Sequence, residues 1–308
     1  MKVVFMGTPE FADVTLRELI KFHNVCAVVT QIDKPKGRGK KIVPSIVKKT
    51  AIEFGIPVLQ PKSAKDDDFA DELEKFGADI FIVAAYGQIL PERILNMPKH
   101  GCINVHGSLL PLLRGASPIQ TSIIDGFEKT GVTIMYMAKG LDSGDIISKK
   151  EVIIEKNDTY GTLGGKLAHA GANLLIDTLK NIEKGSAKGE KQNESKATFC
   201  HVLDKSVGHI DWNKSAFEIN CLQRGLTPQM GAYCYYNDDM LKIWNTEVSD
   251  KEYNVENGTI AEILKKGFAV QCGKGSLRVL SVQAKGGKIM DTDAYMRGHS
   301  IEKSMILK

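Results

Sequence analysis

The chain has 308 residues and a formal net charge of +4, so its length suits two domains or one large one. Its composition is ordinary for a soluble globular protein, no apolar run approaches the roughly 18 residues of a membrane span, and the six cysteines form no C-x-x-C pair of a zinc or redox site. We therefore expect a cytoplasmic monomer with reduced thiols, without a bound metal and without contact with a membrane.

The first half of the chain alternates strand-like and helix-like segments. A helix is predicted after the first strand, with Thr8 as its N-cap and Pro9 at its first position. The turn before it has a single glycine, Gly7, which argues against the G-x-G-x-x-G turn of a nicotinamide site. A second amphipathic helix is predicted at Asp66–Phe76. The alternation favours an α/β, Rossmann-like domain with a mostly parallel sheet. Its strands are predicted at Val3–Met6, Val25–Thr30, Ile80–Ala85, Cys102–Val105 and Val132–Met137.

The second half of the chain changes character after one more helix, which is predicted at Tyr160–Ile182. A stretch rich in Lys, Glu, Gly and Ser follows, as in linkers. Short strands then suggest a small, OB-like β-barrel. We expect a first domain at 1–187, a linker at 188–205 and a second domain at 206–308. The strands of the second domain are predicted at Ala232–Tyr236, Leu241–Val248, Gly258–Ile263, Phe268–Cys272 and Ser276–Gln283.

A basic segment follows the second predicted strand. Residues 34–49 contain seven basic side chains and no acidic one. Such a segment is either a solvated loop or a flexible basic arm that reaches phosphate groups. A plain strand–helix connection is shorter than this, which favours the arm.

Two polar residues lie at the end of the fourth predicted strand. Asn104 and His106 are two positions apart, so they share one face of that strand. Asp142 comes later in a glycine-bracketed loop that could bring its carboxylate to the imidazole. Taken singly, these residues could be a turn cap, a core histidine and a loop acid. Taken together, an amide, an imidazole and a carboxylate can polarise a carbonyl and move a proton.

The surrounding sequence resembles the catalytic segment of the 10-formyltetrahydrofolate-dependent formyltransferases. The shared features are Asn-x-His, Ser-Leu-Leu-Pro, Arg-Gly and a later Gly-Leu-Asp-x-Gly loop. The resemblance implies that Asn104 stabilises an oxyanion and that His106 and Asp142 jointly handle protons. It also implies 10-formyltetrahydrofolate as co-substrate. The implied folate-binding residues lie in two loops that follow strands: Tyr86, Gly87, Gln88, Ile89, Leu90, Pro91, Ser108, Leu109, Leu110 and Pro111. Without the resemblance, residues 86–91 could also be an ordinary turn that ends at Pro91.

The basic segment resembles the insertion loop of those formyltransferases that act on charged initiator tRNA. The resemblance implies that Arg38, Lys40 and Lys41 contact the tRNA and that the methionine amine is formylated for translation initiation. The C-terminal domain is either a structural cap or, as we prefer, a tRNA-binding barrel with candidate contacts at Lys265, Lys266, Lys274 and Arg278. The chain departs from the family at Leu112 and Leu113, where a basic and an aromatic residue are usual, and at 226–230. Alternatives are a formyltransferase for an amino-sugar nucleotide, a folate hydrolase or dehydrogenase module, and a non-catalytic RNA-binding protein.

Overall fold

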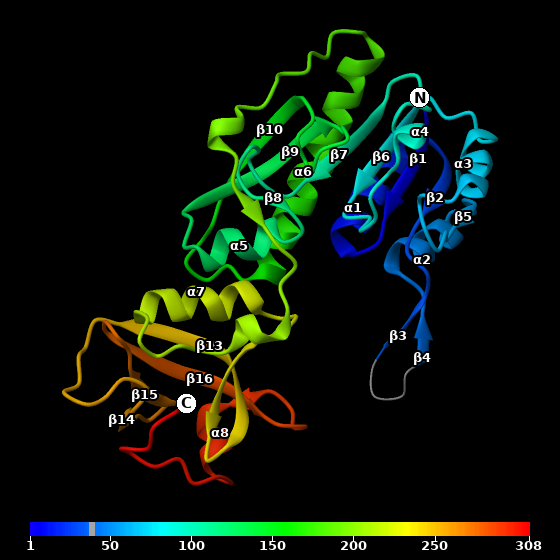
Figure 1. The fold of residues 1–308 in the computed structure, drawn as a ribbon. Coiled ribbons are helices and arrows are strands. Elements are labelled where there is room, and N and C mark those ends of the chain that lie inside the picture. Colours follow the sequence, from blue (N-terminus) through cyan, green and yellow to red (C-terminus); the bar gives the residue numbers. More distant parts are fainter. Residues whose placement is uncertain (37–40) are drawn as a thin grey trace. The chain divides into compact units, whose positions relative to one another are not determined.

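The computed structural model describes residues 1–36 and 41–308, which form two compact units (Figure 1). Unit 1 contains most of the first two thirds of the chain, and unit 2 contains the C-terminal third with two short earlier segments. Unit 1 comprises Met1–Pro118, Lys129–Ile153 and Gly164–His201; unit 2 comprises Ile119–Glu128, Ile154–Leu163 and Val202–Lys308. Most of the segment predicted as a linker therefore belongs to unit 1, while the domain boundaries given above stay a prediction.

A seven-stranded sheet forms the centre of unit 1, in the order β10-β9-β7-β6-β1-β2-β5. The pairs from β5 to β7 are parallel, whereas β9 runs antiparallel to both β7 and β10. The expected mostly parallel sheet is confirmed, and β10 is a strand that the sequence pattern missed. The strands are β1 (Lys2–Gly7), β2 (Asn24–Val29), β5 (Val58–Leu59), β6 (Ile80–Ala84), β7 (Cys102–His106), β9 (Lys129–Tyr136) and β10 (Ile146–Ile153).

Helices cover both faces of this sheet because its buried strands present apolar side chains in both directions (Figure 1). Val4 and Met6 of β1 belong to one apolar cluster with Phe69 and Leu73 of α3. On α6, the backbone at Gly171 lies against the valine side chains of β7 and β9. The helices are α1 (Glu10–Phe22), α2 (Ile46–Glu53), α3 (Asp67–Glu74), α4 (Glu92–Leu95), α5 (Pro118–Ile124) and α6 (Tyr160–Glu183).

The predicted cap of the first helix is wrong. Helix α1 begins at Glu10, and its N-cap residue is Pro9. The Thr8 hydroxyl instead donates to the carbonyl oxygen of Tyr86 (3.3 Å) and accepts from the backbone amide of Gln31 (3.4 Å). Thr8 therefore joins the turns that follow three neighbouring parallel strands, a tertiary role that local sequence does not encode.

Unit 2 is built on an antiparallel sheet in the order β12-β13-β16-β15-β14, and β17 also pairs with β16. The chain end pairs with both outer strands: Ile260 donates its amide to Met305, and Tyr235 exchanges two backbone hydrogen bonds with Lys308. This pairing closes much of the sheet, as expected for a barrel-like domain. The elements are α7 (Ala216–Leu226), β12 (Ala232–Tyr236), β13 (Asp239–Ser249), β14 (Ile260–Ile263), β15 (Phe268–Gln271), β16 (Ser276–Ala284), β17 (Met290–Asp291) and α8 (Thr292–Met296).

Short elements complete the fold. β3 and β4 pair antiparallel in a small ribbon, and β8 pairs in parallel with β11 within unit 1. In the part of the chain that the structure describes, no helix is long and apolar enough to cross a membrane. The short elements are β3 (Lys34–Lys36), β4 (Lys41–Val43), β8 (Arg114–Gly115), η1 (Glu194–Lys196), β11 (Phe199–Cys200) and η2 (Lys205–Gly208).

Candidate active site

The end of β7 brings the three predicted catalytic residues together. Asn104 and His106 alternate along this strand, and Asp142 lies in the loop between β9 and β10. β9 runs antiparallel to β7 and ends at Tyr136, opposite Ile103, so the loop that follows β9 must run back along β7 to bring Asp142 to His106. The Asn104 Nδ2 lies 3.4 Å from Asp142 Oδ1, and the His106 Nδ1 lies 3.6 Å from Asp142 Oδ2. The carboxylate therefore stands between the amide and the imidazole.

The imidazole of His106 is held at both ring nitrogens. Its Nε2 lies 3.0 Å from the carbonyl oxygen of Leu113. A carbonyl oxygen can only accept, so Nε2 carries a proton in this arrangement. The Nδ1 atom faces the Asp142 carboxylate, with Oδ2 at 3.6 Å. With its side chain 6% exposed, His106 is shielded from water, and this strengthens both interactions.

Two residues that touch the imidazole have unusual backbone conformations. Leu113 (φ 56°) and Asp142 (φ 45°) are in the left-handed region, which non-glycine residues rarely adopt. Gly115 (φ 121°) donates its amide to Asp142 Oδ2 at 2.8 Å. The Asp142 carboxylate thus has a fixed backbone donor besides its two side-chain neighbours.

The loop from Ser108 to Pro111 begins two residues after His106. Ser108 donates its hydroxyl to the carbonyl of Leu112 (2.6 Å), and Thr133 of β9 donates to the carbonyl of Ser108 (2.7 Å). Thr133 also accepts from the amide of Leu110, at 3.1 Å. Leu112 is exposed and donates no side-chain hydrogen bond, as its apolar chemistry requires. These bonds fix the path of the loop beside the end of β7.

The predicted folate loop at Tyr86–Pro91 follows β6, which neighbours β7. The Tyr86 ring is buried, and burial raises the pKa of its phenol to about 12. The Tyr86 carbonyl accepts from Gln31 at 3.2 Å, and Gln88 Oε1 accepts from the Ala64 amide at 2.6 Å. The Tyr86 ring is packed in the apolar core, with its buried hydroxyl making no hydrogen bond to the described residues, and the Gln88 amide is bound by the protein. This loop can therefore offer a ligand mainly the backbone groups that remain free. The only large apolar side chain that it exposes is Ile89, at 75%.

The predicted basic arm is described in part. Arg38 and Lys40 lie outside the described residues, and Lys41 is the first residue of β4. Lys48 forms an ion pair with Asp33 at 2.7 Å and donates to Gln60 at 2.6 Å. This ion pair lowers the pKa of the Asp33 carboxyl. Lys48 is therefore part of the supporting structure of unit 1.

The sequence pattern missed a group of supporting residues in 188–205. Gln192 donates to the carbonyls of Asp142 and Gly144, Arg114 pairs with Glu194, and Thr198 accepts from the Leu113 amide. Of the supporting side chains in these contacts, only Arg114, which lies outside this segment, was part of a recognised sequence motif, Arg-Gly. The others stand in a polar, low-complexity stretch whose composition resembles a linker.

The sequence also gave no sign of an aromatic cluster on unit 2. His209 lies within 5.3 Å and 5.8 Å, between ring centroids, of Tyr233 and Tyr235. On the adjacent strand β13, the Lys242 ammonium lies 5.6 Å from the Trp244 ring. Tyr233 pairs with Lys242 across the two strands, so these side chains share one face of the sheet.

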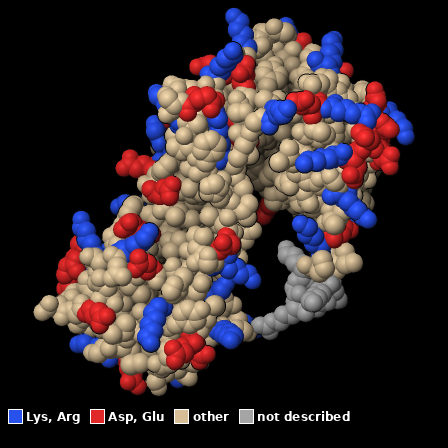
Figure 2. Space-filling model, in the orientation of Figure 1, with Lys and Arg blue, Asp and Glu red and all other residues tan. Residues whose placement is uncertain are grey.

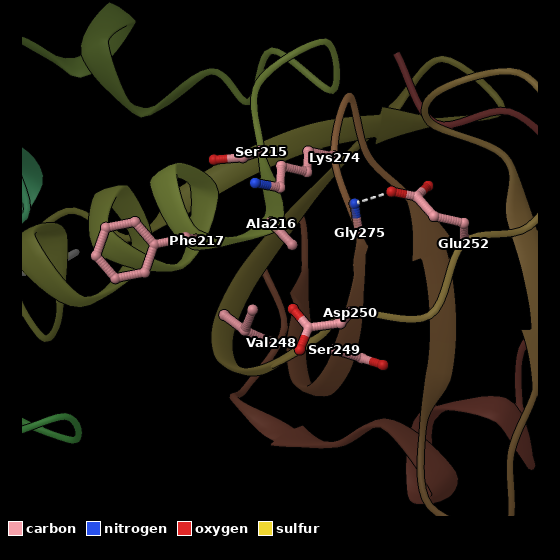
Figure 3. Close-up of a pocket in the computed structure, with 9 residues that line it drawn as sticks. All are labelled: Ser215, Ala216, Phe217, Val248, Ser249, Asp250, Glu252, Lys274 and Gly275. Atoms are coloured by element: carbon pink, nitrogen blue, oxygen red, sulfur yellow. Dashed lines mark hydrogen bonds between the residues drawn. The ribbon is translucent and has the colours of Figure 1, made fainter.

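Unit 2 also contains a pocket of about 390 Å³ (Figure 3). The Gly275 amide in its wall already donates to Glu252 at 2.6 Å, and this bond lowers the pKa of the Glu252 carboxyl. None of the three predicted catalytic residues lines the pocket. Over residues 1–36 and 41–308, no group of three or more His, Cys, Asp and Glu side chains is arranged to hold a metal ion.

Family comparisons show which family the chain belongs to. Residues 1–179 match the model of the formyl transferase family, and residues 202–300 match the model of the formyl transferase C-terminal domain. Methionyl-tRNA formyltransferase of Lachnospira eligens is 47% identical over 313 aligned positions, which cover 100% of this chain and 99% of that protein. The enzyme of the same name from Clostridioides difficile is 46% identical, and both chains are fully covered.

Solved structures show the same fold at much lower identity. An N-formyltransferase from Helicobacter canadensis, in complex with folinic acid and dTDP-3-aminofucose, has a TM-score of 0.69 at 21% identity, over 92% of this chain and 100% of that one. HypX from Aquifex aeolicus, in complex with tetrahydrofolic acid, has a TM-score of 0.64 at 13% identity, over 100% of this chain and 50% of that one.

Proposed function

Since this chain belongs to the formyl transferase family, we propose on that premise that it transfers a formyl group to the amine of methionyl-tRNA. Full-length identity of 46–47% to relatives named for that activity carries the conclusion. The sugar-modifying N-formyltransferase from Helicobacter canadensis is only 21% identical, so it bears on the fold alone. The chain formylates initiator methionyl-tRNA and thereby serves translation initiation.

A formyl-folate is the co-substrate, as the family and its folate-bound structural neighbours imply. We propose the specific donor 10-formyltetrahydrofolate. Its pterin lies against the loops at 86–91 and 108–111 and beside the Asp142 loop. The side chains of Tyr86 and Gln88 are already held by the protein, which supports recognition of the pterin by backbone groups. The departures at Leu112 and Leu113 then leave folate binding intact.

The transfer is a nucleophilic substitution at the formyl carbon. The lone pair of the methionine amine forms the new C–N bond, and the carbonyl oxygen becomes an oxyanion. Asn104 Nδ2, which uses only one proton on Asp142, donates to it, and the His106 ring donates when one of its nitrogens exchanges its protein partner for the oxyanion. The intermediate collapses when the bond to the folate nitrogen breaks, and that nitrogen takes a proton while the former amine loses one. The His106–Asp142 pair, whose atoms lie 3.6 Å apart, carries this proton exchange.

RNA recognition is assigned to both units. We propose that Arg38, Lys40 and Lys41 of unit 1 contact the tRNA, and that residues 206–308 form the second RNA-binding domain after a catalytic domain at 1–187. Acidic and basic side chains are interspersed over the visible face of the molecule, so charge alone marks no RNA face there (Figure 2). The aromatic and cationic side chains on β12 and β13 supply base-stacking groups, and this supports them as the C-terminal contact.

A comparison of two acceptor substrates distinguishes this function from the alternative, formylation of an amino-sugar nucleotide. The chain is incubated with 10-formyltetrahydrofolate and either charged initiator tRNA or an amino-sugar nucleotide, and the formyl group in each acceptor is quantified. Transfer to the methionine amine with no transfer to the sugar is expected. Efficient formylation of the sugar nucleotide, with none of the tRNA, would overturn the assignment.

A further inference from the structure

The side chain of Gln192 holds the loop that carries Asp142. Its Nε2 donates to the carbonyl oxygens of Asp142 and Gly144, each at 2.8 Å. Both amide protons of Gln192 are thereby used on two carbonyls of one loop. These bonds constrain the backbone of Asp142 in its unusual left-handed conformation.

A buried arginine fixes the orientation of that amide. The Gln192 Oε1 accepts from Arg114 Nε at 3.1 Å and from Arg114 Nη2 at 2.8 Å. Arg114 also forms a two-pronged ion pair with Glu194, with distances of 2.9 and 2.8 Å. Because Arg114 donates only, the amide oxygen of Gln192 must face it, and the NH₂ group must face the Asp142 loop. The amide cannot flip without losing all four bonds.

The same segment fixes the other contact of the imidazole. Thr198 accepts from the amide of Leu113 at 2.8 Å, and Leu113 is the residue whose carbonyl faces His106 Nε2. Backbone pairing between β8 and β11 then locks Gly115, which donates to the Asp142 carboxylate. Residues 192–200 thus support both partners of His106.

We propose that Gln192 is a positioning residue that sets the Asp142 carboxylate against His106, with Arg114 and Glu194 orienting its amide. The inference rests on the proposed function, since it assumes that Asp142 and His106 handle protons in the transfer. It predicts a specific defect: misplacing the Asp142 loop lowers turnover, while the loops at 86–91 and 108–111 still bind folate. A displacement of about 1 Å at such a site can cost about 100-fold in rate.

The test compares Gln192→Ala, Gln192→Glu and Asp142→Asn in the full chain. Lys191→Ala, which alters the exposed neighbour, is the matched control. The readouts are kcat, KM for each substrate, the pH profile of kcat and the unfolding temperature. We expect both Gln192 variants to lower kcat about 10- to 100-fold, with KM within about threefold and with a shifted acid limb of the pH profile. Gln192→Glu should be no better than alanine, since a carboxylate has no proton for the two carbonyls.

The double variant Gln192→Ala/Asp142→Asn separates the possible roles. If Gln192 acts through Asp142, its loss should have little further effect once the carboxylate is gone. Full additivity of the two defects, or a fall in kcat with an unchanged pH profile and a lowered unfolding temperature, would overturn the positioning role. Wild-type turnover in Asp142→Asn would instead overturn the proton-handling role of Asp142 on which the inference rests, while the proposed transfer to methionyl-tRNA would stand.

Discussion

At the residue scale, the candidate site depends on backbone strain that its neighbours stabilise. Leu113 and Asp142 both have positive φ, which costs non-glycine residues on the order of 1–3 kcal/mol each. The strain has a geometric result: it turns the Leu113 carbonyl toward His106 Nε2 and the Asp142 carboxylate toward Nδ1. Both ring nitrogens are therefore oriented before any substrate binds.

Asn104→Ala should reduce kcat about 100-fold or more, because one oxyanion donor is lost. Asn104→Asp should be no better, since a carboxylate cannot donate to a developing anion. Single-turnover transfer to charged initiator tRNA measures the chemical step directly.

His106→Ala and Asp142→Ala should also remove most turnover while tRNA affinity stays close to that of the wild type. Near-normal turnover in any of these alanine variants would remove that residue from the mechanism.

The buried His23 should make unit 1 less stable as the pH falls. Its side chain is 5% exposed, its ring nitrogens make no hydrogen bond, and burial beside the N-terminal ammonium lowers its pKa. The Glu183 carboxylate opposes that effect from 3.8 Å. As the pH falls below about 6.5, the unfolded chain takes up a proton that the folded chain resists, so stability is lost. Urea midpoints at pH 7.5 and 5.5 should differ less for His23→Gln than for the wild type.

The exposed His169 supplies the control for that measurement. His169→Gln should keep the full difference between the two urea midpoints. An equal pH response in wild type and His23→Gln would exclude His23 as its source.

At the element scale, the short pairing of β8 with β11 ties the catalytic loops to residues far along the chain. β8 lies directly after the Ser-Leu-Leu-Pro loop, and β11 lies 85 positions later, as the Phe199 and Arg114 pair shows. Each strand has only two residues, so the pairing persists because Thr198 and Arg114 add side-chain bonds around it. A small element of this kind has no periodicity from which it could be predicted.

Gly115→Ala should break this pairing. A Cβ at this position would lie 2.1 Å from the carbonyl oxygen of Cys200, and φ is 121°. Because backbone must move to relieve the clash, we expect the free energy of unfolding of unit 1 to fall by about 1–3 kcal/mol, together with turnover. Calorimetry checks the first effect. Gly164→Ala in helix α6, where nothing lies within 4 Å, is the control and should not destabilise the protein.

The basic arm should act on the tRNA and not on the chemistry. Arg38→Ala should lower transfer to charged initiator tRNA far more than it lowers slow hydrolysis of the formyl donor. Neutralising Lys40 and Lys41 should weaken tRNA binding and flatten its salt dependence, because fewer counterions are released. Both activities and a salt titration are measured on the same variants. An equal loss of transfer and donor hydrolysis in Arg38→Ala would assign the arm to folding or folate binding.

At the scale of the whole molecule, the two units contain different sets of candidate functional residues. Unit 1 contains the three catalytic candidates and both predicted folate loops, while unit 2 contains a largely closed antiparallel sheet with an aromatic, cationic face. Of the basic residues considered on unit 2 from sequence, Arg278 is engaged with Glu247 at 3.1 Å, whereas Lys265 and Lys266 are exposed. Unit 2 should therefore affect the binding of the large substrate more than the rate of the reaction.

The double variant Tyr233→Leu/Tyr235→Leu should raise KM for charged tRNA several-fold and leave kcat unchanged, because base stacking contributes about 1–3 kcal/mol per base. Lys265→Gln/Lys266→Gln is the matched comparison on another part of unit 2. Steady-state measurement of KM for charged tRNA at two salt concentrations distinguishes the tyrosine variant from the lysine variant. If only the lysine pair changes KM, the RNA contacts that part of the unit and the aromatic side chains only stabilise the sheet.

Elements with strong local signals could be predicted from the amino-acid pattern alone. Apolar strands such as Val3–Met6, the periodic helix at Tyr160–Ile182 and the strands of unit 2 could be predicted because their patterns lie within a few residues. The motif around Asn104, His106 and Asp142 could also be recognised in the sequence, and the comparisons confirm the family that it indicated. The roles of these residues stay predictions.

The contacts that hold the site in place come from segments far apart in the sequence. Thr8 caps no helix because its hydroxyl has a partner 78 positions away, in the Tyr86 turn. Gln192 stands in a sequence with the composition of a linker, yet it donates to a loop 50 positions earlier. Such bonds depend on which strands become neighbours in the sheet. Local propensity and periodicity contain no information about these long-range neighbours, so the support of the site became visible only in the folded chain.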